Sequence, residues 1–172
     1  MASMKQSSIL QGVARKGSVL QVVSATKTDT FSASSSTFTD VTGLSATITP
    51  SSTSSTIWVS VSANISGQLN GHRIFARLLR GATVINAGAS AGSRRPAFFG
   101  GYVNSTNGTQ KYGAESVATN FLDSPASTSA TTYKVQVAAT SGAVNVNRDG
   151  EDSDSANYAR TPSTVTLWEV AG

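Results

Sequence analysis

The sequence predicts an all-β protein: a single antiparallel β-sandwich of jelly-roll-like type with a short extended N-terminal arm. Serine and threonine recur along the whole chain between short alternating apolar runs, a composition that favours pleated strands joined by turns. Turn signals separate about eight to ten short strands at the spacing of sandwiches and barrels. No run has the pattern of a helix of roughly ten residues or more, which disfavours a parallel βαβ architecture.

Strict alternation marks the two strongest strand signals, at residues 57–65 and 133–139. In the first run isoleucine, valine and alanine occupy every second position, which predicts one face on the core and one wetter face. Trp58 falls on the wetter face. We therefore expect Trp58 to meet a second surface, either a subunit contact or a crevice.

The remaining strands are expected in shorter or weaker runs. Residues 72–80 favour a strand, although Arg73, Arg77 and Arg80 also fall at helical spacing, so a helix is the alternative. The last strand nearly ends the chain and is expected to lie inside a sheet. A loop is expected at 51–55 and a tight turn at 104–108. The other expected strands are 19–25, 29–33, 38–49 with a break at Gly43, 83–87, 97–103, 116–122, 144–146 and 164–170.

Charge is distributed unevenly along the chain, although the net charge is only +4. The segment before Asp29 contains basic residues and no acidic one: Lys5, Arg15, Lys16 and Lys27. Such an arm could contact nucleic acid, but it has no aromatic residue to stack on bases, so an acidic protein surface fits at least as well. No apolar run approaches the roughly 20 residues that span a bilayer. Nucleic acid and membrane are therefore not expected partners.

Two units are expected on these grounds. Residues 1–17 form a docking arm, because a polar segment of that composition cannot build a core of its own and gains order only against a neighbour. Residues 18–172 form the β-sandwich domain.

Catalytic chemistry is sparse in this sequence, which has one histidine, no cysteine and nine acidic residues. The sequence contains no nucleophile-elbow motif with which His72 could act as a catalytic base. His72 is therefore interpreted as a polar residue at a strand start. Paired carboxylates for hydrolysis lack a motif as well. Asp40 and Asp123 stand beside turn residues and are expected to bond local backbone N–H groups. We expect no enzymatic activity and no cofactor.

The acidic loop at 149–154 contains the one candidate for a metal site. Hard oxygen ligands at close spacing are what Ca²⁺ requires, and the loop supplies Asp149, Glu151, Asp152 and Asp154. The register is not that of an EF-hand. A solvated loop whose carboxylates pair with Arg148 or Arg160 is the favoured interpretation.

A second candidate interface lies in the segment where Arg94 and Arg95 precede Phe98 and Phe99. Arginine with aromatics is typical of an interface anchor, and a surface loop over a buried aromatic pair is the alternative. Together with Trp58, this unexplained aromatic surface predicts a homo-oligomer, most simply a trimer.

Several phrases of the sequence, in order, resemble a virion structural protein family that is common in tailed phages, especially marine ones. The likeness covers roughly residues 17–172, and its specificity lies in the succession of phrases rather than in any one of them. The phrases are GSVLQVV at 17–23, TKTDTF at 26–31, FTDVTGL at 38–44, ITPSSTSS at 48–55, NFLDSP at 120–125, TTYKVQ at 131–136, VNR at 146–148 and STVTL at 163–167.

This resemblance implies a compact β-sandwich, a trimer displayed on the outer surface of the phage particle, with no catalytic residues. The leading hypothesis is a decoration protein anchored to the capsid or another virion surface by its arm. The alternative is the head of a short tail fibre that binds a host surface glycan or protein. A fibre shaft is not expected, because the extended arm would reach only roughly 55 to 60 Å. A tailspike-type hydrolase is a third hypothesis, which failure to depolymerise host capsule would remove.

Overall fold

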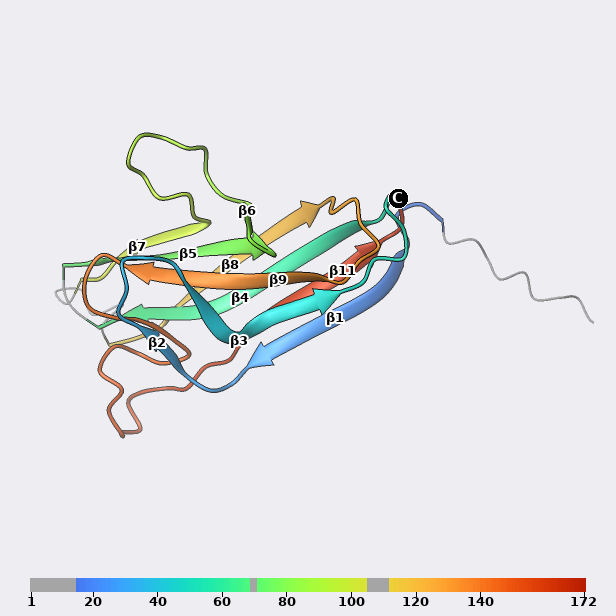
Figure 1. The fold of residues 1–172 in the computed structure, drawn as a ribbon. Helices are drawn as coiled ribbons and strands as arrows, with labels where there is room; N and C mark the ends of the chain where they lie inside the picture. Colours follow the sequence, from blue (N-terminus) through green and yellow to red (C-terminus); the bar gives the residue numbers. More distant parts are fainter. Residues whose placement is uncertain (1–14, 69–70, 105–111) are drawn as a thin grey trace, which may run out of the picture.

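The computed structural model describes residues 15–68, 71–104 and 112–172. They form two antiparallel sheets packed face to face, with both layers running along the long axis of the molecule (Figure 1). Lys5 and most of the expected arm lie outside the described residues, as do positions 105–108 of the expected turn.

The first sheet is built around one long central strand, β4 (Thr56–Gly67). The edge strand β8 (Glu115–Asp123) pairs with one side of β4. On the other side β4 pairs first with β11 (Ser163–Val170) and, further along, with the short β10 (Val144–Val146). Strand β1 (Val19–Lys27) extends the sheet beyond β11, and β2 (Phe31–Ala33) extends it beyond β10.

The second sheet follows the same plan around β5 (Arg73–Arg80). Strand β9 (Thr131–Ala139) pairs with one side of β5, and β3 (Thr39–Ile48) pairs with β9 at the edge. The other side of β5 pairs with β7 (Phe99–Tyr102) and then with β6 (Thr83–Ile85).

The order of the strands identifies the fold as a jelly roll. If the principal strands β1, β3, β4, β5, β7, β8, β9 and β11 are numbered one to eight along the chain, the first sheet reads 1-8-3-6. The second then reads 2-7-4-5. This is the eight-stranded arrangement of two Greek keys that closes into a double-sheet sandwich. The predicted all-β, antiparallel, jelly-roll-like sandwich is confirmed.

The core lies between the two sheets and is formed by the alternating positions that the sequence indicated. Ile57, Val59 and Val61 of β4 point inward with no more than 1% of their surface exposed. They pack in one cluster with residues such as Val135 and Val137 of β9. The burial of every second side chain is what commits each strand to its register, because a one-residue slip would expose the whole apolar set.

Three finer expectations have clear outcomes. The run at 72–80 is a strand, and the helical alternative was wrong, because Ile74, Ala76 and Leu78 alternate into the core. The final strand β11 lies inside its sheet between β1 and β4, as expected. The described residues contain eleven strands rather than about eight to ten, since three of the strands are only three residues long. No described helix is long and apolar enough to cross a membrane.

Candidate interaction surface

A continuous line of apolar side chains crosses the outer face of the first sheet. Val22 of β1 stands opposite Trp168 of β11. Trp168 stands opposite Trp58 of β4, which stands opposite Leu122 of β8. Val22, Trp58 and Leu122 are 54%, 42% and 51% exposed, and Trp168 is half-buried. We call these four residues the apolar row. The expectation that Trp58 points away from the core is confirmed, and three exposed or half-buried neighbours accompany it.

The two lines of side chains next to the apolar row, across β1, β11, β4 and β8, carry no charge. The next line across the sheet is Ser24, Thr166, Ser60 and Asn120, and the one after it is Thr26, Thr164, Ser62 and Ala118. Hydroxyl pairs join β1 to β11, at 3.0 Å between Ser24 and Thr166 and 3.2 Å between Thr26 and Thr164. We call this surface, with the apolar row, the uncharged face.

The outer face of the second sheet is different in kind, because it is covered by charged groups. Lys134 Nζ lies 2.8 Å from a carboxylate oxygen of Asp40. The guanidinium of Arg77 lies 4.0 Å from the centre of the Phe38 ring. The two outer faces therefore suit different partners, because one carries these uncharged lines and the other carries an ion pair and cation–π contacts.

The root of the N-terminal arm lies at the same end of the sandwich as the apolar row. Gly17 N–H donates to the carbonyl of Ala171 at 2.8 Å, and Ala171 N–H donates to the carbonyl of Ser18 at 2.8 Å. These bonds hold the start of β1 against the end of β11, where the C-terminus is marked in Figure 1. Exposed Arg15 and Lys16 precede β1 at this bonded end, seven and six residues before Val22 of the apolar row.

The other candidate interface segment lies on the opposite sheet, so the structure does not bring it together with Trp58. Phe98 and Phe99 are half-buried and pack against the core. Arg94 and Arg95 are exposed in the loop between β6 and β7. Arg95 donates to the carbonyl of Ser36, and its guanidinium lies 5.3 Å from the Phe75 ring. This geometry matches the alternative of a surface loop over a buried aromatic pair, and an interface role for these residues stays a prediction.

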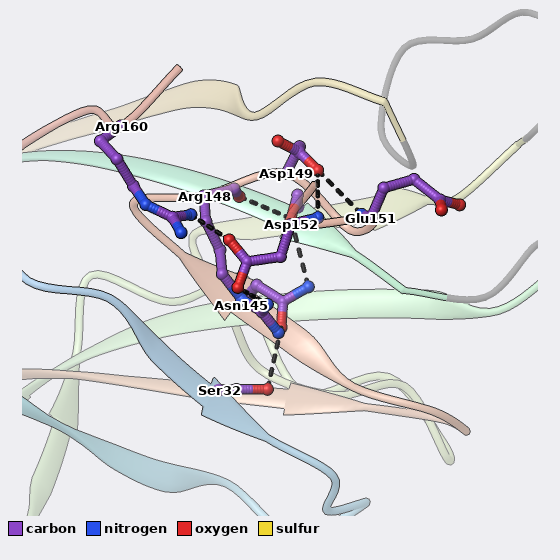
Figure 2. Close-up of polar contacts among 8 residues, drawn as sticks. Ser32, Asn145, Arg148, Asp149, Glu151, Asp152 and Arg160 are labelled. Atoms are coloured by element: carbon purple, nitrogen blue, oxygen red, sulfur yellow. Dashed lines mark hydrogen bonds and ion pairs between the residues drawn. The ribbon is translucent and has the colours of Figure 1, made fainter. Parts of the chain in front are cut away.

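Figure 2 shows the acidic loop that the sequence offered as a metal candidate. Asp152 accepts from Arg148 at 2.5 Å and also pairs with Arg160, which is the pairing that the sequence favoured. The hydrogen bond from Arg160, with that from Arg148, lowers the pKa of Asp152 against the opposing effect of its partial desolvation. Asp149 Oδ1 accepts from the N–H groups of Glu151 and Asp152 at 2.8 and 2.7 Å.

A metal role for Asp149, Glu151, Asp152 and Asp154, the weaker alternative from the sequence, stays untested. Within the described ranges, no group of three or more histidine and carboxylate side chains is placed to hold a metal ion. Asp154 is exposed, and the Asp152 carboxylate already serves two guanidinium groups.

Two carboxylates that were expected to bond local backbone have distant side-chain partners instead, so that prediction was wrong. Asp123 accepts from Arg80 Nη1 at 2.8 Å and from the Tyr133 hydroxyl at 2.6 Å. Asp40 accepts from Lys134 at 2.8 Å and from Gln136 at 2.5 Å. Both lie in strands, Asp40 in β3 beside β9 and Asp123 at the end of β8 facing the second sheet. There the charged and hydroxyl donors offer stronger bonds than a local N–H.

Glu169 is a buried carboxylate that the sequence reading did not single out. It lies on the inward side of β11 with 0% of its surface exposed. Ser51, through N–H and hydroxyl, and the hydroxyl of Ser55 donate to Oε1, while Gln21 Nε2 donates to Oε2. Burial alone would raise the pKa of Glu169, but these bonds outweigh it and lower the pKa to about 2. A polar residue at an inward position of an alternating strand is the signal that could have found it.

His72 lies immediately before β5 and is buried, with 1% of its surface exposed. Neither ring nitrogen has a hydrogen-bond partner among the described residues, so no described serine or carboxylate orients it as a base. The expectation that the chain is not an enzyme stays a prediction.

Comparison with known proteins gives matches only among solved structures. No protein-family model and no curated protein sequence matches the chain. A structure of infectious bursal disease virus, Gt strain, is similar at 16% identity and a TM-score of 0.45 over 100% of this chain and 42% of that one. The VP2 subviral particle of infectious bursal disease virus gives 16% identity and a TM-score of 0.41 over 88% of this chain and 38% of that one. The chain thus spans about two fifths of these viral chains, and likeness of this degree carries no functional information.

Proposed function

We propose that this protein is a non-enzymatic structural component of a bacteriophage virion. In this proposal it is a decoration protein on the outer surface, anchored by its N-terminal arm to the capsid or to another virion protein. The observation that supports the proposal is the coincidence, at one end of a jelly roll, of the root of a basic arm and an exposed apolar row. Such a sandwich is also the architecture of many viral capsid domains, and the resemblance of the sequence points the same way.

Copies of this protein meet through the uncharged face, forming a homotrimer. An apolar row with polar but neutral neighbours favours a neutral partner, because a charged surface would lose its hydration there without gaining an ion pair. A second copy meets this condition without any like-charge repulsion. Because contacts around a three-fold axis are heterologous, the Val22 end of the row in one copy faces the Leu122 end in the next.

Replacing Trp58 by aspartate is expected to convert the trimer into a monomer. The change removes a large apolar anchor and buries an unpaired charge in the contact, and loss of a central aromatic anchor alone costs about 2 kcal/mol or more per contact. Multi-angle light scattering at micromolar concentration measures the mass. The matched control is Ser45→Asp, which adds the same charge to the exposed outer side of β3 in the second sheet and should leave the trimer intact. A wild-type protein that is monomeric, or a Trp58→Asp variant that stays trimeric, contradicts the contact.

Deleting residues 1–16 is expected to leave the sandwich folded and to abolish binding to phage particles stripped of this protein. The truncation keeps Gly17, whose N–H bonds the end of β11, so thermal unfolding should change little. Co-sedimentation with stripped particles measures attachment. A full-length control with Arg15→Glu and Lys16→Glu tests the charge of the arm alone, and its binding should weaken most at low salt. Unchanged affinity of the truncated protein would show that attachment does not use the arm.

One observation favours a second candidate, the head domain of a short tail fibre that binds a host glycan or protein. The loop between β10 and β11 lies at the end of the sandwich away from the C-terminus and the root of the arm (Figure 1), where an anchored subunit would display it to the host. Copy number separates the two candidates. Hundreds of copies per particle, counted by quantitative mass spectrometry of purified virions, support decoration, whereas a small multiple of three or six supports a fibre.

A further inference from the structure

The carboxylate of Asp149 has one oxygen in use and one without a partner. Oδ1 caps the N–H groups of Glu151 and Asp152, which fixes the orientation of the side chain. Oδ2 is buried and accepts no hydrogen bond from any described residue, and the whole residue is only 3% exposed. In Figure 2 the dashed lines from Asp149 leave one oxygen only. A charged acceptor that is buried and unpaired is unfavourable, so this oxygen is suited to a donor from outside the chain.

A cavity of about 220 Å³ lies against Asp149. Thr161 also lines it, and the Thr161 hydroxyl is likewise buried without a partner in the described part of the chain. The two residues that carry these unsatisfied atoms, Asp149 and Thr161, therefore line one space from the two ends of the β10–β11 loop. The Asp149 carboxylate accepts hydrogen bonds, whereas the Thr161 hydroxyl can donate or accept. A ligand that can both donate and accept would therefore satisfy the two groups.

Aromatic side chains and an amide complete the lining of this cavity. Tyr112 and Tyr158 contribute rings, and Asn157 contributes a group that both donates and accepts. Aromatic walls with a few convergent polar groups are typical of small-ligand sites, and a volume below roughly 300 Å³ suits a ligand smaller than a drug-sized molecule. A single sugar ring has this size, two apolar C–H faces for the aromatic walls, and hydroxyls that donate and accept.

Other ligand classes fit these groups less well. A phosphate or a nucleic acid would meet the negative charge of Asp149. Calcium takes six to eight oxygen ligands, and the described residues place no group of three carboxylate or histidine side chains together. An ammonium group only donates, so it could not accept from Asn157.

We infer that this cavity is a binding subsite for one saccharide ring, with Asp149 Oδ2 and the Thr161 hydroxyl bonding its hydroxyls between Tyr112 and Tyr158. The site lies far from the proposed trimer contact. Asn147 N–H bonds the carbonyl of Asn64 at 2.9 Å, six residues along β4 from Trp58, a separation of roughly 20 Å by strand rise. The inference needs neither the arm nor the trimer, so particle attachment and sugar binding can fail independently.

Saturation-transfer NMR of the full chain with glucose, galactose, mannose and N-acetylglucosamine tests the site. We expect at least one sugar to bind with millimolar affinity. The Asp149→Asn variant should weaken that binding roughly tenfold or more, because its amide keeps an oxygen for the two N–H groups and presents NH₂ where Oδ2 stood. The matched control is Asp154→Asn, which removes the same charge from an exposed side chain that does not line this cavity and should bind as the wild type does.

A second variant keeps the test decisive if Asp149→Asn fails to fold. Thr161→Val replaces an unpartnered hydroxyl by a methyl group of the same shape, which is neutral or stabilising for the folded state. It should therefore keep or raise the melting temperature while weakening sugar binding. If none of the four sugars binds the wild type, or if either folded variant binds like the wild type, the inference is overturned. Equal binding of ethylammonium in place of the sugars would also overturn it, in favour of a cation site.

Discussion

Acidification is expected to lower the unfolding free energy of the wild-type protein by about 3 kcal/mol more than that of the Glu169→Gln variant. The carboxylate of Glu169 is fully buried and accepts from Ser51, Ser55 and Gln21. These donors belong to the loop after β3 and to β1, so the single carboxylate ties three parts of the chain together at the arm end of the sandwich.

The direction of the effect follows from the pKa of Glu169 in the two states. Its ordinary value of 4.5 falls to about 2 in the folded protein, so the folded state releases the proton more readily than the unfolded state. The contribution to stability is therefore complete above about pH 4.5 and is lost as the pH falls towards 2. A difference of roughly two and a half pKa units, at 1.36 kcal/mol each, gives the expected size of about 3 kcal/mol.

Urea unfolding of both proteins at neutral pH and at about pH 2.5, at one protein concentration, measures the effect. Other carboxylates also have a lowered pKa, such as Asp40 and Asp152. Their protonation destabilises the wild type and the variant equally, so it cancels when the two losses of unfolding free energy are compared. Asp154→Asn, at an exposed position, serves as the matched control and should lose as much stability as the wild type. Equal losses in the wild type and Glu169→Gln would show that the buried carboxylate is not the acid-sensitive group.

The jelly roll could be predicted because its strands are specified by local alternation. Each inward set, such as Ile57, Val59 and Val61, lies within one strand, and the period of two alone decides its face. The outward position of Trp58 follows from the same rule. The apolar row could not be predicted in this way, because Val22, Trp168 and Leu122 join Trp58 only through the registers of three strand pairs.

Carboxylate partners were the least predictable feature for the same physical reason. Local turn chemistry was expected to bond Asp123, but its partner Arg80 lies 43 positions away in the sequence. The cavity beside Asp149 also depends on distant segments, since Tyr112 precedes β8 while Asp149 and Thr161 flank the loop before β11. Sequence reading identified the acidic loop as chemically unusual, whereas its contacts and unsatisfied oxygen emerge only from the fold.

Replacing Asp123 by alanine is expected to destabilise the fold by about 3 kcal/mol or more. Asp123 stands on β8 of the first sheet, while Arg80 and Tyr133 stand on β5 and β9 of the second. The three side chains therefore fasten the two sheets together. Burial, with the hydrogen bond to Asp123 and its charge, raises the pKa of Tyr133. Its hydroxyl therefore stays protonated as a donor and loses its acceptor when the carboxylate is removed.

Tyr133→Phe provides the matched comparison, with an expected loss of about 1 to 1.5 kcal/mol, since it removes one hydrogen bond and leaves the Arg80–Asp123 pair intact. In the double variant the loss should be smaller than the sum, because the unpaired hydroxyl that makes Asp123→Ala costly is then absent. Additive losses in urea unfolding would mean that the two residues act separately. Leu122, the end of the apolar row, directly precedes Asp123 on β8. Loosening this strand in a folded Asp123→Ala protein should therefore also weaken the trimer. The buried contacts between the sheets would in this way stabilise the assembly surface outside them.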